Sequence, residues 1–425
     1  MRPLKKTLRI NENHVTSEEF RAGLESQGWH FGATDNGRVW HVDRDNTSRA
    51  LGSTLEHLRG DFYIQELSAS MSVWHLAEGK THPEPYRILE MAASPGGKTT
   101  QLSEHYPNAF IVANEFAKDR INALIDNIER MGSCNIAVTN YNGVQFRSFP
   151  EAFDRVLLDA PCSGEGIGFK AEESLKYWNI KNVKTIARLQ AKLLEAGIDA
   201  LRPDGELLYS TCTLNKFENE GVIDAAKEKF GDAIEVVFAK RFWPHIETAG
   251  GFFVAKIRKI RSTNTENSRP TLQSNDALER LLGRDEIMVR TTLESMGATA
   301  IIQNSLARFY RYKNDVLLVT SPAEIDDIFD ALYCIRFGMR IGRIEDGSFV
   351  PGHFLGANFE LTSLPRLDLD IESLDRYLGG FELNYEEFAG RNSYVQLFAN
   401  GRPLSVSSVE GGKIRNLFPK SWLRR

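Results

Sequence analysis

The stretch that most constrains the fold of this chain runs from Arg87 to Thr99 and reads RILEMAASPGGKT. A short apolar run leads into a turn that contains Pro95, Gly96 and Gly97, and a helix-forming segment follows the turn. A buried strand, a glycine turn and a helix N-terminus form a cradle for a nucleotide-like ligand, because glycines let backbone approach the ligand and free N–H groups point at it. Any α/β turn can contain glycines, so the stretch alone leaves the ligand site open.

The same residues fit a second kind of site. Residues 92–99 match the phosphate-binding pattern G-x-x-x-x-G-K-[ST], except that Ala92 replaces the first glycine. The run from Val156 to Asp159 resembles the strand that holds magnesium in such enzymes. A P-loop NTPase is therefore an alternative at this point, and residues further along the chain must decide.

The length and composition indicate a multi-domain globular protein. At 425 residues the chain exceeds the usual single-domain size, so two or three domains are expected. The sequence contains no run of about eighteen apolar residues, and no apolar signal core follows its charged start. We therefore expect a cytoplasmic protein, monomeric and without a membrane partner.

The four cysteines argue for chemistry at two positions. Cys134, Cys162, Cys212 and Cys334 lie far apart and form no C-x-x-C pair, so structural zinc and a disulfide framework are not expected, and we predict no metal site. A cysteine is most often a small buried hydrophobe. Cys162 and Cys212, however, each follow the end of an expected strand.

From residue 87 onward, the pattern alternates between strands and helices. Strands are expected at 87–91, 110–115, 136–140, 154–159 and 205–211, and helices at 98–105, 117–131, 181–201 and 215–229. This alternation favours a doubly wound parallel sheet that is covered on both faces. Two final runs, 234–239 and 251–258, have no helix between them and predict an antiparallel hairpin, as in sheets of the methyltransferase type.

The rest of the chain divides by composition. Residues 1–80 indicate an α/β lead-in, residues 81–260 the main α/β domain, and the polar residues 261–276 a linker. The lead-in is expected to bind RNA only on the strength of the family resemblance described below. Residues 277–345 indicate a small α/β domain. Residues 346–425 are β-rich, with turns expected at Asn400-Gly401 and Gly411-Gly412.

The net charge of −5 argues against indiscriminate nucleic-acid binding, but it hides three basic clusters. They lie at residues 1–10, at 256–261 and in the tail from Lys413 onward. One cluster alone would be an ordinary solvated surface. Three clusters at three domain edges fit a protein that grips a polyanion.

Acidic and thiol side chains follow three of the expected strands. Glu115 ends the second strand, about 20 residues past the glycines, where a carboxylate accepts hydrogen bonds from ribose hydroxyls. An NTPase has no need of that carboxylate, although an acid at a strand end also occurs by chance. Asp159 and Cys162 follow the fourth strand, and Cys212 follows the fifth. Because loops at the carboxyl ends of such strands form the ligand crevice, two thiols and a carboxylate are expected in one cleft.

The motifs EMAASPGGKTTQ, LLDAPCSGEG and YSTCTLNKFENE together resemble the Nop/Sun family of S-adenosylmethionine-dependent RNA cytosine-5 methyltransferases. The segments YIQELSAS, GGFFVAKIRK and RFGMRIGRIEDGSFVPGHFLGA extend the resemblance over nearly the whole chain, and the similarity is greatest to the RsmF-type 16S ribosomal RNA enzymes. The resemblance implies a Rossmann-like class I methyltransferase sheet and a β-rich, PUA-like, RNA-binding C-terminal region.

The resemblance also implies residue roles that fit the chemistry. Cys212 matches the nucleophile that adds to carbon 6 of cytosine, and Cys162 matches the thiol that resolves the covalent adduct. Asp159 can hydrogen-bond ring nitrogen 3 and the exocyclic amine. The residues that match the contacts to S-adenosyl-L-methionine are Ala92, Ala93, Ser94, Pro95, Gly96, Gly97, Lys98, Glu115, Asn142 and Asp159.

The chain departs from the family pattern at three positions of the cofactor region. The family more often has Asp where Glu90 and Asn142 stand, and Ala where Ser94 stands. We predict an RNA cytosine-5 methyltransferase that acts on an unstacked base in small-subunit ribosomal RNA. Transfer RNA is the alternative substrate, and a P-loop NTPase or a non-catalytic RNA-binding platform are the alternatives outside this class.

Overall fold

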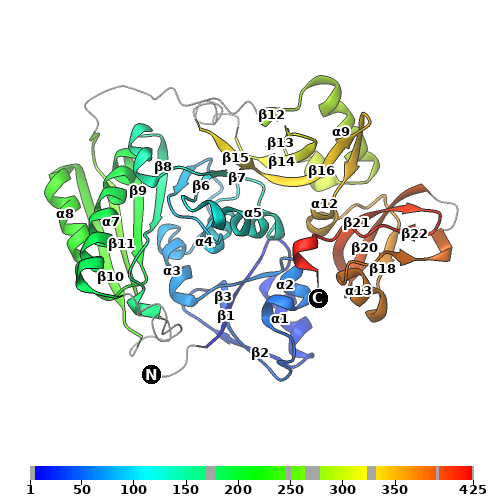
Figure 1. Cartoon of the computed structure of the whole chain (residues 1–425), viewed down its shortest axis with the longest axis horizontal. Coiled ribbons are helices and arrows are strands. Elements are labelled where there is room, and N and C mark those ends of the chain that lie inside the picture. The colour runs from blue at the N-terminus through cyan, green and yellow to red at the C-terminus, as the bar shows by residue number, and fades with distance from the viewer. Residues whose placement is uncertain are drawn as a thin grey trace.

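An eight-stranded sheet forms the centre of the molecule (Figure 1). The computed structural model describes residues 5–167, 178–244, 250–263, 278–322, 332–388 and 392–423. The strand order is β10-β11-β9-β8-β5-β6-β7-β15, and the five strands from β9 to β7 run parallel. The strands are β5 (Arg87–Glu90), β6 (Phe110–Asn114), β7 (Ile136–Thr139), β8 (Phe153–Asp159), β9 (Leu201–Thr211), β10 (Ile234–Phe242), β11 (Phe252–Lys259) and β15 (Cys334–Phe337). The doubly wound sheet and its antiparallel β10–β11 hairpin are confirmed.

Helices cover both faces of this sheet. One hydrophobic cluster joins Ile88 to α3 (Leu67–Leu76), α4 (Gly97–His105) and α5 (Ile121–Arg130). The other joins Leu89 to α7 (Ile180–Ala200) and α8 (Glu220–Phe230) on the opposite face. Adjacent residues of a strand point to opposite faces, so a strand covered on both sides needs apolar side chains on both, as Ile88 and Leu89 of β5 provide.

The lead-in forms a four-stranded antiparallel sheet in the order β2-β3-β1-β4. Its elements are β1 (Thr7–Ile10), α1 (Ser17–Glu25), β2 (Trp29–Ala33), β3 (Val39–Arg44), α2 (Leu55–Leu58) and β4 (Phe62–Ile64). Arg9 is fully buried, forms an ion pair with Glu104 of α4 and donates to Gln65 and Thr100. The expectation that Arg9 belongs to a polyanion-binding surface is therefore wrong, because its charge holds the lead-in against the central domain.

Two of the four cations of the second basic cluster are also buried. Lys256 is 3% exposed and its Nζ lies 3.0 Å from carboxylate oxygens of both Glu206 and Glu78. Lys259 is fully buried, and its Nζ donates to the backbone oxygens of Ile198 and Leu201. These two lysines satisfy acceptors on neighbouring elements, so they are not available to an RNA-binding face, whereas Arg258 and Arg261 stay exposed and are paired with acids.

A second sheet of five strands follows, in the order β12-β13-β14-β16-β17. Its elements are β12 (Leu278–Arg280), α9 (Gly283–Ser295), α10 (Thr299–Ile302), β13 (Ala307–Tyr312), β14 (Asp315–Thr320), β16 (Met339–Glu345) and β17 (Ser348–Pro351). The expected boundary at 345/346 falls inside the β16–β17 hairpin, and β15 pairs with β7 at the edge of the central sheet. Strand pairing thus joins the expected small domain both to the C-terminal region and to the central sheet. Residues 264–277, most of the expected linker, lie outside the described residues.

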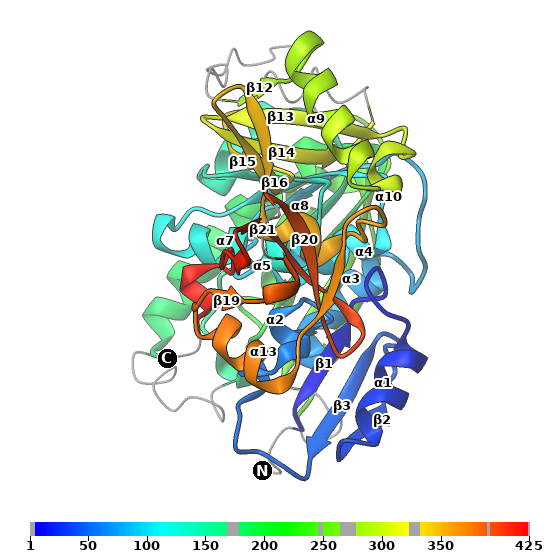
Figure 2. The same ribbon diagram turned by 90° about the vertical axis from the view of Figure 1, so that its right-hand side faces the viewer.

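The C-terminal region contains a third sheet of five strands, in the order β18-β20-β21-β22-β19, and lies next to the lead-in (Figure 2). Its elements are α12 (His353–Asn358), β18 (Arg366–Asp368), α13 (Ile371–Leu378), β19 (Leu383–Asn384), β20 (Asn392–Ala399), β21 (Arg402–Glu410) and β22 (Lys413–Ile414). Asn400, Gly401, Gly411 and Gly412 all have positive φ, which confirms both expected turns.

The C-terminal region is packed onto the rest of the molecule. Leu55 and Leu58 of α2 belong to the same hydrophobic cluster as Tyr377. Asp61 is fully buried, with its carboxylate 2.9 Å from Arg402 and bonded to Arg59. The region is thus part of one packed body. No helix among the described residues is both long and apolar enough to cross a membrane.

Candidate active site

The two thiols and the carboxylate meet at the carboxyl ends of neighbouring strands. Asp159 is the last residue of β8, Cys162 lies in the turn that follows, and Cys212 comes directly after β9. The two Sγ atoms lie 2.8 Å apart. Asp159 accepts a hydrogen bond of 2.7 Å from Ser210 and forms an ion pair of 2.8 Å with Lys98. The structure therefore brings these predicted residues together in one cleft.

Two acidic residues that the sequence reasoning missed hold the thiol loops in place. Glu218 accepts from the backbone N–H of Ser163 and from Gln190, whose side chain also donates to the oxygen of Pro161. Glu165 accepts from the hydroxyl of Thr213 at 3.0 Å and from the next backbone N–H. Both acids lie inside the quoted cysteine motifs, so their place in those motifs was the available signal.

Close backbone contact fixes the Cys212 turn. The N–H of Gly166 donates to the carbonyl of Cys212 at 2.9 Å, and the N–H of Gly251 donates to Gly166 at 3.1 Å. A Cβ added at Gly166 would lie only 2.1 Å from the oxygen of Gly251. Glycine is needed here because the two backbones approach more closely than any side chain allows.

The surroundings of Cys162 hold its thiol in the protonated form. The hydrogen bond from Cys162 to Cys212, burial, and the negative charges of Cys212 and Asp159 together raise the pKa of Cys162 well above its usual value. A thiol with a raised pKa stays protonated and can donate to its neighbour. Cys162 is thus the neutral partner of the pair in this state.

A cavity of about 200 Å³ lies beside the thiols and between the lead-in and the glycine turn. The predicted residues that line it are Ala92, Ala93, Ser94, Pro95, Gly97, Lys98 and Asp159. Tyr63, Gln65 and Glu66 of the lead-in also line it, although no site role was predicted for them. The described residues contain no group of three or more His, Cys, Asp or Glu side chains arranged to hold a metal ion.

Three predicted cofactor residues do not line this cavity. Gly96 has a φ of 105° and packs toward Leu124 of α5. Glu115 is buried and accepts hydrogen bonds from the backbone N–H groups of Ser94, at 3.1 Å, and Ala117, at 2.8 Å. Asn142 is exposed and caps a short helical turn through the N–H of Val144. Glu115 therefore ties the glycine turn to the end of β6 in addition to any contact with ribose.

Glu90 is a further acidic residue in the cavity wall. It is 1% exposed, and its Oε2 has no hydrogen-bond partner in the described part of the chain. Burial raises the pKa of Glu90 to about 8, and the charges of Asp159 and Glu115 act in the same direction. A buried carboxyl group with one unpartnered oxygen in the wall of a cavity fits a ligand that carries a cationic group, and S-adenosylmethionine carries both an ammonium and a sulfonium.

The raised pKa of Glu90 predicts a pH-dependent stability. Between the ordinary value of 4.5 and about 8, the folded chain retains a proton that the unfolded chain has released. The stabilisation from this group is therefore complete below pH 4.5 and is lost as the pH rises to 8. We expect Glu90→Gln to remove this loss, which amounts to a few kcal/mol. Urea unfolding of the unaltered chain and of the variant at pH 5 and pH 8 measures the change in the free energy of unfolding. An equal change with pH in the two proteins would contradict the prediction.

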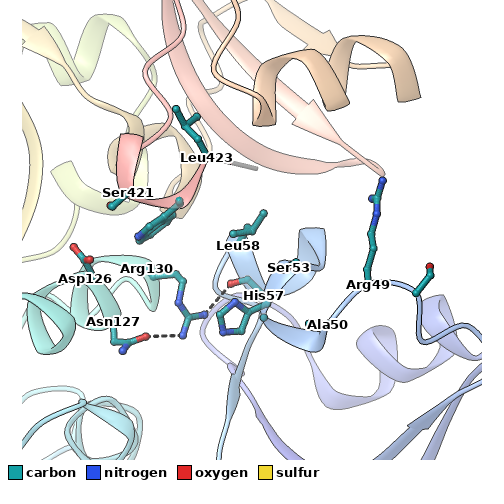
Figure 3. Close-up of a pocket in the computed structure, with 13 residues that line it drawn as sticks. Arg49, Ala50, Ser53, His57, Leu58, Asp126, Asn127, Arg130, Ser421 and Leu423 are labelled. Atoms are coloured by element: carbon teal, nitrogen blue, oxygen red, sulfur yellow. Dashed lines mark hydrogen bonds between the residues drawn. The ribbon is translucent and has the colours of Figure 1, made fainter. Parts of the chain in front are cut away.

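A larger cavity of about 600 Å³ lies away from the thiols, among the lead-in, α5 and the C-terminal tail (Figure 3). Arg130 of α5 reaches across it and donates to Asn127 and to the backbone oxygen of His57. Asn127 in turn donates to the oxygen of Pro95 at 2.9 Å. Arg130 and Asn127 thus connect the wall of this cavity to the cofactor turn, and the residues that line it include neither of the two thiols nor Asp159.

Comparisons with known proteins agree with this geometry. A family model described as "16S rRNA methyltransferase RsmB/F" matches residues 80–258. The ribosomal RNA small subunit methyltransferase F of Salmonella typhi is 31% identical over 446 positions, covering all of this chain and 91% of that protein. The protein of the same name from Shewanella piezotolerans is 31% identical and covered to 92%.

Solved structures resemble the chain over 61% of its length. A methyltransferase homologue from Pyrococcus horikoshii is 29% identical, with 88% of that chain covered and a TM-score of 0.54. NSun6 from the same organism, solved with SFG, is 22% identical, with 92% covered and a TM-score of 0.53. The second similarity concerns the fold alone.

Proposed function

Because the chain belongs to the RsmB/F family of 16S rRNA methyltransferases, we propose that it methylates carbon 5 of a cytosine in small-subunit ribosomal RNA through a covalent cysteine–cytosine intermediate. S-adenosylmethionine is its cofactor and supplies, when bound, an electrophilic methyl group. The observation that carries the proposal is the pair of thiols 2.8 Å apart beside Asp159. The relatives are methyltransferases, so the P-loop NTPase alternative has no support from them.

Carbon 5 of cytosine is a poor nucleophile, and the pair of thiols offers a solution. The thiolate of Cys212 adds to carbon 6, and the ring becomes an enamine-like species that can take the methyl group at carbon 5. The proton on carbon 5 then leaves, and the bond between Cys212 and carbon 6 breaks. The ring is restored and Cys212 is again a thiolate.

Cys162 suits the removal of the carbon 5 proton only after the covalent bond has formed. In the free enzyme, the hydrogen bond to Cys212 and the charge of Cys212 raise the pKa of Cys162. Once Cys212 is bonded to carbon, it carries no charge, and both of these causes are lost. The pKa of Cys162 then falls, so its thiol can release its proton to solvent and, as a thiolate, accept the proton from carbon 5.

Asp159 is held where charge develops on the base. Ser210 and Lys98 each bond one of its two oxygens. Burial alone would lower the pKa of Lys98, but the charge and hydrogen bond of Asp159 raise it, so the lysine stays cationic. A fixed, ion-paired carboxylate can accept from the exocyclic amine of the target cytosine without rearranging during the reaction.

The direct test of the proposed function is the product. The purified chain is incubated with S-adenosylmethionine and a 16S ribosomal RNA transcript, and the RNA is analysed by bisulfite sequencing. We expect one protected cytosine. If a transfer RNA treated in the same way is protected from bisulfite conversion instead, the alternative substrate is supported. Methyl transfer to RNA without any cytosine protected from conversion would contradict carbon 5 chemistry.

Cofactor binding should depend on Glu115. We expect Glu115→Ala to weaken S-adenosylmethionine binding by about 1–3 kcal/mol, because charge-assisted hydrogen bonds to ribose and the link to Ser94 are lost together. Isothermal calorimetry measures the affinity for S-adenosylmethionine. Asp119→Ala, which removes an exposed acid nearby, is the matched control. Tight binding of magnesium-ATP by the unaltered chain would contradict the methyltransferase assignment.

A further inference from the structure

The exposed face of α7 carries a stripe of positive charge. Lys181, Lys184, Arg188 and Lys192 are all exposed, and their spacing places them on one side of the helix over about 16 Å. Residues 178–194 contain no acid. No ion pair joins these four cations to another described residue, and the first acid of the helix, Glu195, is already paired with Arg147 and Lys229.

This stripe is unfavourable for the helix itself. Like charges three or four residues apart repel one another on a helix surface. Cations in the first turns also oppose the helix dipole, and the first turn of α7 contains no acid that would offset them. An anion bound along the stripe would relieve both costs.

Helix α7 packs against the thiol loops through the side opposite the stripe, and Lys184 of the stripe reaches the segment that follows Cys212. Gln190, on the buried side of α7, donates to the carbonyl of Pro161 at 2.8 Å, immediately before Cys162. Lys216 and Phe217 are exposed and follow Cys212 by four and five residues. The Nζ of Lys184 lies 5.4 Å from the ring centre of Phe217, so the two segments meet.

An exposed aromatic ring next to a row of cations is the arrangement that single-stranded nucleic acids favour. Phe217 is 47% exposed, and every nucleobase can stack on such a ring. The cations can contact successive phosphates, and each contact releases a counterion.

We propose that the stripe Lys181–Lys184–Arg188–Lys192, with Lys216 and Phe217, binds the RNA backbone that flanks the target cytosine. This inference rests on the proposed function for the identity of the RNA. It takes the place of the basic clusters at 1–10 and 256–261, in which Arg9, Lys256 and Lys259 are buried. RNA is favoured over an acidic protein because the stripe reaches the segment that follows Cys212, and this segment carries an exposed aromatic ring.

The salt dependence of RNA binding tests the proposal. Binding of the full chain to a fluorescent twenty-nucleotide single-stranded cytidine RNA is measured at several salt concentrations. The variant carries Lys181→Gln, Lys184→Gln and Arg188→Gln. We expect the slope of log K against log salt to become shallower by about 2, since each lost phosphate contact on a single strand removes about 0.7. In methylation assays, KM for RNA should rise while kcat and cofactor affinity stay unchanged.

A matched control removes three exposed cations elsewhere, with Arg280→Gln, Arg284→Gln and Lys313→Gln. This control variant should show the same slope of log K against log salt as the unaltered chain. An unchanged slope in the α7 variant, or an equal change in the control, overturns the proposal and assigns the stripe to another partner. The binding assay needs no methyl transfer, so a shallower slope without carbon 5 methylation would refute the proposed chemistry and leave the RNA surface standing.

Discussion

Replacing Cys162 with alanine is expected to trap the enzyme on its RNA, whereas replacing Cys212 with alanine is expected to abolish methylation altogether. Cys212→Ala removes the nucleophile, and no other described thiol lies within hydrogen-bond distance of this position except Cys162, which has a raised pKa and is protonated. Cys162→Ala leaves addition and methyl transfer possible but slows loss of the carbon 5 proton, so the bond between Cys212 and carbon 6 persists.

Denaturing electrophoresis with radiolabelled 16S ribosomal RNA separates these outcomes. A covalent protein–RNA complex should accumulate with Cys162→Ala and be absent from the double variant. Cys134→Ala, which removes a buried thiol outside the cleft, is the matched control and should behave as the unaltered chain. Trapping by Cys212→Ala would reverse the two assignments, and no trapping by either variant would remove the support for the release role of Cys162.

The second large effect is expected for stability. Asp61 is fully buried and neutralises two arginines, Arg59 from its own segment and Arg402 from β21. Asp61→Ala leaves the buried Arg59 and the partly buried Arg402 without this counter-charge, and breaking a buried ion pair from one side costs about 3–5 kcal/mol. We therefore expect a correspondingly lower free energy of unfolding in urea, together with separation of the C-terminal region from the lead-in.

The chain contains a matched surface pair for comparison. Arg366 and Asp368 have the same Arg-x-Asp spacing and the same two-point contact, but both side chains are about half exposed. Asp368→Ala should cost no more than about 1 kcal/mol, because solvent screens the pair. Equal losses of unfolding free energy in the two variants would mean that burial does not strengthen the interaction of Asp61 with Arg59 and Arg402.

The fold and the site could be predicted where the deciding interactions are local. The parallel strands of the central sheet each contain a short apolar run, and Asp159, Cys162 and Cys212 follow the ends of two such runs. Because β8 and β9 are adjacent and parallel, their ends must meet, and the thiols with them. The same reasoning missed β15, which reaches the central sheet from nearly 200 residues beyond β7, its partner. A pairing over that distance leaves no trace in a local pattern.

The sequence by itself determined the sheet, the glycine turn and the reactive groups, because these follow from hydrophobic periodicity and from residue types at strand ends. Only the tertiary structure decided which charges face the solvent. Arg9 is neutralised by Glu104 and Lys256 by Glu206, partners that lie far along the chain. Lys181 and Lys184 have no such described partner and stay exposed. The burial of a charge depends on the counter-charge that folding brings to it, and a count of basic residues along the chain contains no information on that.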